Sequence, residues 1–289
     1  MGEREKEIRT DWSSILQERS GRGSGARLPA VAPLGSYDGM LVRALLSEDE
    51  CIAFVRATEA TGYGSTDYAQ TFRGNLRLMT HDSALASKLF LRLRPHLPET
   101  LLLDPESNAA AGHVRPPGVW RLAGLNEKFR FAKYRPGDEF QPHVDAKFVR
   151  GQEQSAFSVN VYLNADFYGG ATRFFGEMVW WPEGKRPVAE NLAVDLSVQP
   201  ECGAACIFRQ PVDSCRGPSI LHDGQRVTRG FKYLLRTDVL YRREEVSASF
   251  HALEDIVTDI PRPTPCAVTP TSRSAPPDPP SSAPPAPRM

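Results

Sequence analysis

Two residues that commonly bind metal ions stand close together in YRPGDEFQPHVDAKF, residues 134–148. One residue separates His143 from Asp145, so in an extended backbone their side chains point to the same side. A neutral imidazole and a carboxylate suit ferrous iron, and a third ligand would complete a facial triad with open coordination positions. Alone the pair is weak, because two solvated loop residues would fit the same polar, turn-rich composition.

A third ligand must come from a distant part of the chain, which has six histidines in total. Apart from His143, only His222 lies within the β-rich region described below. It ends a short apolar run, and we expect a turn at Asp223–Gly224 to follow it. We therefore choose His222 as the third ligand.

Lys232 follows His222 by ten residues, in the apolar stretch GFKYLLRTDVLY. A lysine in a buried strand must be paired or neutral, so either a ligand carboxylate or a protein carboxylate would satisfy it. Arg236 stands four residues later and therefore faces the same side of a strand. It could assist or replace Lys232, or it could pair with an acid.

The elements that must position these residues have a period of two from Glu127 onward. Strands are predicted at 128–134, 155–163, 171–175, 203–208 and 230–241. No helical pattern alternates with them, which favours an antiparallel sheet pair or barrel over a parallel sheet.

Helical signals precede this region. Ser47 and Glu50 form a capping box, which predicts a helix that begins there. Asp82 can cap a second helix, which Pro95 ends. We interpret both helices as packing elements that support the strands.

The sequence therefore predicts an α+β chain with a β core. We divide it into a disordered lead-in at 1–35, a helical N-terminal layer at 36–118, the β core at 119–245 and a Pro-rich disordered tail at 246–289. Eleven of the 25 prolines lie in that tail. It could bind an SH3 or WW module, although an inert tail is the simpler interpretation.

Taken together, these motifs resemble the iron- and 2-oxoglutarate-dependent dioxygenases, specifically the prolyl 4-hydroxylase-like catalytic domain. The resemblance lies in the H-x-D pair, His222, and Lys232 ten positions beyond it. FRFAKYRPGDEFQPHVD, VNVYLN with GGATRFF, and HDGQRVTRGFKYLLRTDVLY follow in the family's order. It covers about residues 125–241 and does not extend over the N-terminal helices or the tail.

The resemblance implies a double-stranded β-helix (jelly-roll) fold and the use of Fe(II), 2-oxoglutarate, O2 and ascorbate. It implies that His143, Asp145 and His222 bind iron, and that Lys232 holds the distal carboxylate of 2-oxoglutarate.

The resemblance also assigns roles beside the metal. Tyr134 would donate its hydroxyl to the same distal carboxylate, Tyr162 and Thr172 would line the pocket, and Asn160 would lie near the metal. Each has a plainer alternative, since strand tyrosines are commonly core residues and threonine favours strands.

By family analogy, the predicted activity is hydroxylation of peptidyl proline or another protein side chain, with release of succinate and CO2. The same chemistry on a small metabolite is an alternative. A non-catalytic metal- or ligand-binding regulatory module is another, although it would not need three ligands and Lys232 together. A zinc hydrolase could use the three ligands but would not explain Lys232.

Charge and hydropathy indicate which partners to expect. The formal net charge is +0 and the pI is about 7.0, so we expect no nucleic acid partner. No window is apolar enough to span a bilayer, and the first residues lack a signal-peptide core. We expect a cytoplasmic or nuclear protein that does not bind membranes.

Overall fold

Strands dominate the part of the chain that the computed structural model describes, which is residues 6–8, 10–17, 29–103, 118–176, 192–210 and 220–244. The helices are η1 (Ser13–Ile15), α1 (Glu48–Thr61), α2 (Ser83–Leu93) and η2 (Arg94–His96). Neither α1 nor α2 is long and apolar enough to cross a membrane, and the other described helices are single turns.

Most strands join one large sheet in the order β1-β4-β7-β17-β10-β14-β3-β2, with β5, β6 and β9 paired beside this path. Its members are β1 (Lys6–Ile8), β2 (Ala30–Leu34), β3 (Tyr37–Arg43), β4 (Leu76–His81), β5 (Thr100–Leu103), β6 (Gly118–Leu125), β7 (Lys128–Tyr134), β9 (Val149–Arg150), β10 (Glu153–Tyr162), β14 (Ala205–Arg209) and β17 (Lys232–Arg243). The pairings are antiparallel except for β1 with β4.

A second sheet of four antiparallel strands has the order β13-β12-β15-β8. These strands are β8 (Phe140–His143), β12 (Thr172–Phe174), β13 (Leu196–Val198) and β15 (His222–Gly224). A short pair, β11 (Tyr168–Gly169) with β16 (Val227–Arg229), lies apart from both sheets in the hydrogen-bond pattern.

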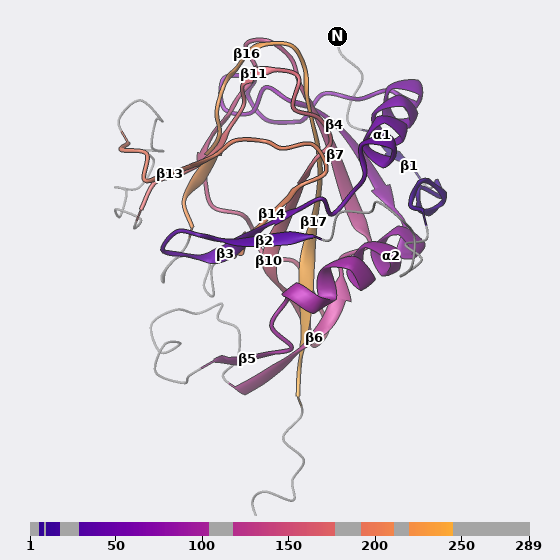
Figure 1. Ribbon diagram of the computed structural model, residues 1–289, viewed down its shortest axis with the longest axis vertical. Helices are drawn as coiled ribbons and strands as arrows, with labels where there is room; N and C mark the ends of the chain where they lie inside the picture. Colours follow the sequence, from indigo (N-terminus) through magenta and orange to yellow (C-terminus); the bar gives the residue numbers. More distant parts are fainter. Residues whose placement is uncertain are drawn as a thin grey trace, which may run out of the picture. The chain divides into compact units, whose positions relative to one another are not determined.

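Alternation along the central strands gives the large sheet two different faces. On β7, Phe129 and Phe131 pack into one hydrophobic cluster, which also contains the buried residues of α1 and α2. Ala132 and Tyr134 belong to a second cluster, which also contains Phe174 of the small sheet. The helices therefore cover one face of the large sheet (Figure 1), and the small sheet covers the other.

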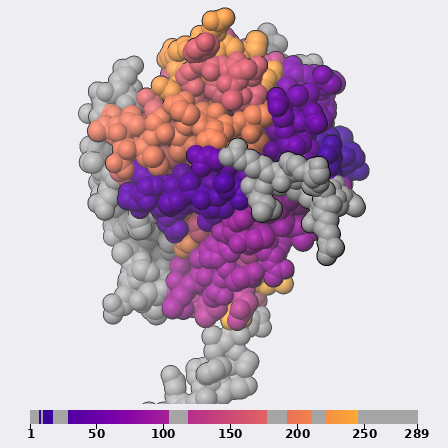
Figure 2. Space-filling view, in the orientation of Figure 1, coloured from indigo at the N-terminus to yellow at the C-terminus, as the bar shows by residue number. Residues whose placement is uncertain are grey.

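Two antiparallel sheets that enclose a core in this way confirm the predicted double-stranded β-helix. The space-filling view shows the N-terminal segment of β2 and β3 lying against the orange segment 192–210 (Figure 2), as expected from the pairing of β3 with β14.

Both helix predictions are confirmed. The Ser47 side chain accepts a hydrogen bond from Glu50 N, and the Glu50 carboxylate accepts one from Ser47 N, which completes the capping box of α1. Asp82 caps α2 by accepting from Leu85 N at 2.8 Å. The Glu50 carboxylate also forms a salt bridge with Arg92 of α2, with Oε1 and Nη2 2.7 Å apart. The capping residue of α1 therefore connects α1 to α2.

The predicted helical layer at 36–118 is wrong where β3, β4 and β5 lie, because these strands extend the large sheet. Pairing with β14, β7 and β6 decides their conformation, which local sequence signals did not reveal. The lead-in at 1–35 likewise contains β1 and β2, and Trp12 is buried in the core. The described residues up to Glu244 form one compact unit, and the predicted tail at 246–289 lies outside the described residues.

Candidate active site

The small sheet brings the two predicted histidine ligands together. His143 ends β8 and His222 begins β15, and these two residues are direct partners in the antiparallel register. Asp223 and Gly224 continue β15 instead of forming the predicted turn, because β8 and β12 pair with β15 on its two sides. Asp223 also pairs with Arg173 of β12 at 2.5 Å, which strengthens this ladder.

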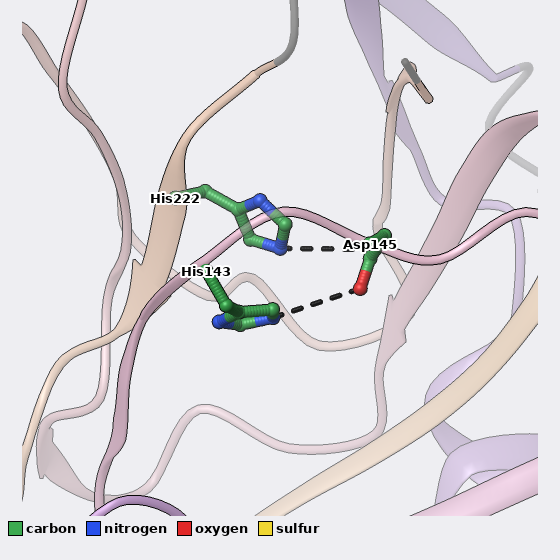
Figure 3. A group of neighbouring side chains, drawn as sticks. All are labelled: His143, Asp145 and His222. Carbon is green, nitrogen blue, oxygen red and sulfur yellow. Dashed lines mark ion pairs between the residues drawn. The ribbon is translucent and has the colours of Figure 1, made fainter. Parts of the chain in front are cut away.

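The three predicted ligands converge on one point (Figure 3). The Nε2 atom of His143 lies 3.6 Å from Oδ1 of Asp145, and Nε2 of His222 lies 3.7 Å from Oδ2. All three donor atoms lie within 4.8 Å of one another. The three side chains would all bind one face of a divalent ion and would leave its other coordination positions open. This is the facial arrangement of a two-histidine, one-carboxylate site.

Backbone carbonyls orient both imidazoles for metal binding. Nδ1 of His143 hydrogen-bonds to the carbonyl oxygen of Gln141 at 2.8 Å, and Nδ1 of His222 to that of Ile220 at 3.0 Å. Because a carbonyl only accepts, each Nδ1 carries the proton and each Nε2 keeps its lone pair. Burial and the neighbouring His143 lower the pKa of His222 to about 4, so it is neutral near pH 7. The donor set therefore fits a ferrous ion.

Asp145 is buried and remains ionised. Burial by itself would raise the pKa of Asp145, but the Arg236 guanidinium and the two histidines hold it well below the usual range. Ser158 donates to its Oδ2 at 2.6 Å, and Arg236 Nη2 lies 3.0 Å from the same atom. Of the alternatives left open for Arg236, the structure therefore shows pairing with an acid.

Lys232 lies in the large sheet, with 3% of its surface exposed. Its Nζ donates to the Gly170 carbonyl at 2.6 Å and lies 5.2 and 5.6 Å from the ring centroids of Tyr134 and Tyr162. Among the described residues no carboxylate lies within ion-pairing distance of it, and burial lowers the pKa of Lys232 to about 8. An anionic ligand would satisfy this amine.

The bend at Gly169–Gly170 creates the room for that amine. Both residues have positive φ, and a side chain on Gly170 would meet Phe167 and, at 3.2 Å, Cδ of Lys232. Glycine is favoured at position 170 because its φ is +69° and because a Cβ would come within 2.7 Å of Cε2 of Phe167.

The remaining predicted residues gather around Lys232 and the metal ligands. The Tyr162 hydroxyl shares a 2.8 Å hydrogen bond with the Thr172 hydroxyl, and burial raises the pKa of both Tyr134 and Tyr162. Tyr134, Thr172 and Asn160 line the pocket, whereas Tyr162 is fully buried and is not among the lining residues. Asn160 Oδ1 is buried with no hydrogen-bond partner among the described residues, so it can accept from a ligand.

These residues line one pocket, in which charged and polar side chains converge on the candidate metal ligands. It also contains residues that the sequence analysis did not select, namely Arg73, Arg130 and Phe140. Arg130 could have been found, because a spacing of two places it on the same face of β7 as Ala132 and Tyr134. Arg73 and Phe140 meet only through a long-range bridge, which no local pattern reveals.

The comparisons with known proteins agree with this geometry. Residues 129–237 match the family model described as the 2OG-Fe(II) oxygenase superfamily, and this segment contains all three candidate ligands and Lys232. No curated protein matches the chain.

The solved structures that are similar to this chain include three prolyl hydroxylases. A viral collagen prolyl hydroxylase from Paramecium Bursaria Chlorella virus-1 is 17% identical, with 73% of this chain and 99% of that chain covered and a TM-score of 0.44. A Pseudomonas putida prolyl-4-hydroxylase is 18% identical, with 73% and 95% covered and a TM-score of 0.44. A Trichoplax adhaerens prolyl hydroxylase in complex with a peptide fragment of the hypoxia inducible factor oxygen degradation domain is 15% identical, with 71% and 84% covered and a TM-score of 0.43.

Proposed function

Because residues 129–237 are a domain of the 2OG-Fe(II) oxygenase superfamily, we propose that the protein hydroxylates a C–H bond of a peptidyl side chain, with proline as the first candidate. The reaction consumes 2-oxoglutarate and O2 and yields the alcohol, succinate and CO2. Bound iron and 2-oxoglutarate supply the oxidising chemistry. The observation that carries this proposal is the convergence of His143, Asp145 and His222 beside an unpaired, buried Lys232.

The residues of the chain divide the work between them. His143, Asp145 and His222 would hold the metal on one face, while Lys232 would bind the distal carboxylate of the cosubstrate. Tyr134 and Thr172 line the same pocket, and their hydroxyls would donate to that ligand. The burial of these groups excludes water, which strengthens each polar contact.

We propose ascorbate as the reductant that keeps the metal ferrous, a cytoplasmic or nuclear location, and no role for nucleic acid. The intact ligand set and the family match favour an enzyme over a non-catalytic binding module. An SH3- or WW-type partner for the Pro-rich segment stays a prediction from its composition.

A peptide library tests the substrate class. Purified protein with Fe(II), 2-oxoglutarate and ascorbate is incubated with arrayed peptides, and products are examined for the mass increase of one oxygen. We expect proline peptides to gain oxygen in step with succinate release. Oxidation of small metabolites alone would contradict a peptidyl substrate and leave the oxygenase chemistry standing.

A further inference from the structure

The pocket contains a second buried cation without a carboxylate partner, Arg73, on the opposite side of the metal-binding strands from Lys232. Gln141 N donates to Phe72 O at 2.9 Å, and Gly74 N donates to Glu139 O at 2.9 Å. These bonds attach the segment around Arg73 to the outer edge of β8, which carries His143. Lys232 instead contacts Gly170, just before β12 on the other side of β15.

The Arg73 side chain is held in place by three contacts, one of which is with the Tyr68 ring, whose centroid lies 5.6 Å from the guanidinium carbon. Its Nε donates to Asn75 Oδ1 at 2.9 Å, and its guanidinium carbon lies 4.4 Å from the centroid of the Phe140 ring. Phe140 in turn stacks on His143 with ring centroids 3.5 Å apart. This arrangement fixes the guanidinium beside a metal ligand. Its two terminal nitrogens have no hydrogen-bond partner among the residues that the structure describes, so they can bind a planar anion.

The charge on Arg73 is not balanced by the described part of the protein. Arg73 is 9% exposed, and no described carboxylate lies within ion-pairing distance of it. By contrast, the neighbouring Arg130 and Arg236 pair with Asp238 and Asp145. Burying an unpaired guanidinium is costly, so the site favours a ligand that supplies a negative charge.

The charge of the whole pocket points to an anion in addition to the cosubstrate. Four cationic side chains line it, namely Arg73, Arg130, Lys232 and Arg236, against Asp145 as the single acidic residue of the lining. The distal carboxylate of 2-oxoglutarate would neutralise Lys232 and leave Arg73 unpaired. Among ionisable groups, Tyr134 has the largest effect on the pKa of Arg73, and its ring centroid also lies 5.2 Å from Nζ of Lys232, so the two cations flank Tyr134 in one pocket. Asp145 also acts on Arg73, whereas Asp223 acts on Lys232.

We propose that Arg73 is a substrate-recognition residue and that the substrate carries a carboxylate close to the carbon that is hydroxylated. This inference rests on the proposed function and narrows its substrate class. The carboxylate could belong to an Asp or Glu next to the target residue of a peptide, or to a small carboxylic acid. Both would bind the terminal nitrogens of Arg73 through charge-assisted hydrogen bonds.

Binding to the Mn(II) form with 2-oxoglutarate tests the inference without turnover. The probes are proline peptides flanked by Asp or Glu, the same peptides with Asn or Gln, and the free dicarboxylic amino acids with their amides. We expect the wild type to bind at least one acid probe about ten-fold or more tightly than its amide. Which acid series binds identifies the source of the carboxylate.

Variants of the protein test whether Arg73 causes the preference for acid probes over their amides. Arg73→Gln should abolish the acid-over-amide ratio, Arg73→Lys should keep part of it, and the exposed Arg56→Gln on α1 serves as the matched control. The Kd of 2-oxoglutarate should change less than about two-fold in Arg73→Gln, since Lys232 holds that ligand.

Three results would overturn the inference: no acid preference in the wild type, including no binding of any probe; an unchanged preference in Arg73→Gln; or a loss of 2-oxoglutarate affinity in Arg73→Gln as large as in Lys232→Ala. Succinate release without substrate separates this failure from that of the proposed function. If the wild type releases succinate but shows no acid preference, only the inference is wrong.

Discussion

Arg236 Nη2 lies 3.0 Å from Oδ2 of Asp145, the oxygen that also accepts a hydrogen bond from Ser158. Two donors therefore hold Oδ2 of Asp145. Oδ1 contacts neither donor and lies toward His143. Asp238 also pairs with Arg236, with Oδ1 of Asp238 3.5 Å from Nη2 of Arg236. Such outer contacts orient a metal ligand and tune its basicity.

Arg236→Gln should weaken metal binding by roughly ten- to a hundred-fold, because Asp145 loses its charged partner. The Kd of Mn(II), measured by electron paramagnetic resonance, reports this directly. Arg242→Gln is a matched control, since Arg242 lies on the same strand and pairs with Glu153 at the surface. Equal metal affinity in both variants would show that Arg236 does not position Asp145.

Lys232→Ala should weaken 2-oxoglutarate binding by about 2 kcal/mol or more, which is roughly 30-fold, because a buried carboxylate would lose its cation. Metal affinity should stay close to that of the wild type, since Lys232 contacts none of the three ligands. Lys133→Ala, on the opposite face of β7 and paired with Glu59, is the control. An unchanged Kd for 2-oxoglutarate would remove Lys232 from the cosubstrate site.

Cosubstrate binding should depend on pH through Lys232. Its pKa in the folded protein is about 8, lowered from 10.5 by burial, and the carboxylate of a ligand would raise it again. At pH 7 the amine is already charged, so binding takes up no proton there. At pH 9 the amine is mostly neutral, so binding takes up a proton and affinity falls about ten-fold per pH unit above 8.

Calorimetry of 2-oxoglutarate binding in buffers of different ionisation enthalpy measures this proton uptake. The lowered pKa of Lys232 also makes the free energy of unfolding depend on pH, in the opposite direction to the affinity for 2-oxoglutarate. The unfolded chain binds the extra proton between pH 8 and 10.5, so the ligand-free protein gains stability from Lys232 as pH rises through that window. Proton uptake that is equal at pH 7 and pH 9 would contradict the assignment.

Ser47→Ala should lower the free energy of unfolding by about 1 kcal/mol through loss of the α1 cap. Cosubstrate and metal affinity should not change, because α1 packs on the face of the large sheet that is away from the pocket. Chemical denaturation measures the loss, and Ser87→Ala, in an exposed position on α2, is the control. A loss in Ser47→Ala no larger than in Ser87→Ala would show that the cap contributes little.

The sequence allowed the long central strands to be predicted well. The prediction of 128–134 coincides with β7, because its apolar residues are divided between the two hydrophobic clusters on opposite faces of the sheet. The short strands β8 and β15 were missed, since partners rather than local propensity define them. Pro142 is tolerated in β8 because the register with β15 shifts at this point, so the missing N–H interrupts no regular ladder.

The site was predictable where spacing along one strand sets it and not where distant segments meet. Lys232 and Arg236 were expected on one face of β17, and both line the pocket. Which of them pairs with Asp145 depends on the path of the chain after β8, which periodicity does not determine. Arg73 stands seventy residues before His143 and reaches the pocket only through its bridge to Phe140.

Succinate release tests the central claim most directly. Purified wild-type protein, His143→Ala and the control His81→Ala, altered at an exposed position on β4, are supplied with Fe(II), 2-oxoglutarate, ascorbate and air. The wild type and His81→Ala should release succinate above the metal-free background, slowly even without substrate, and His143→Ala should release none. Full release by His143→Ala, or no release and no 2-oxoglutarate binding by the wild type, would contradict the account.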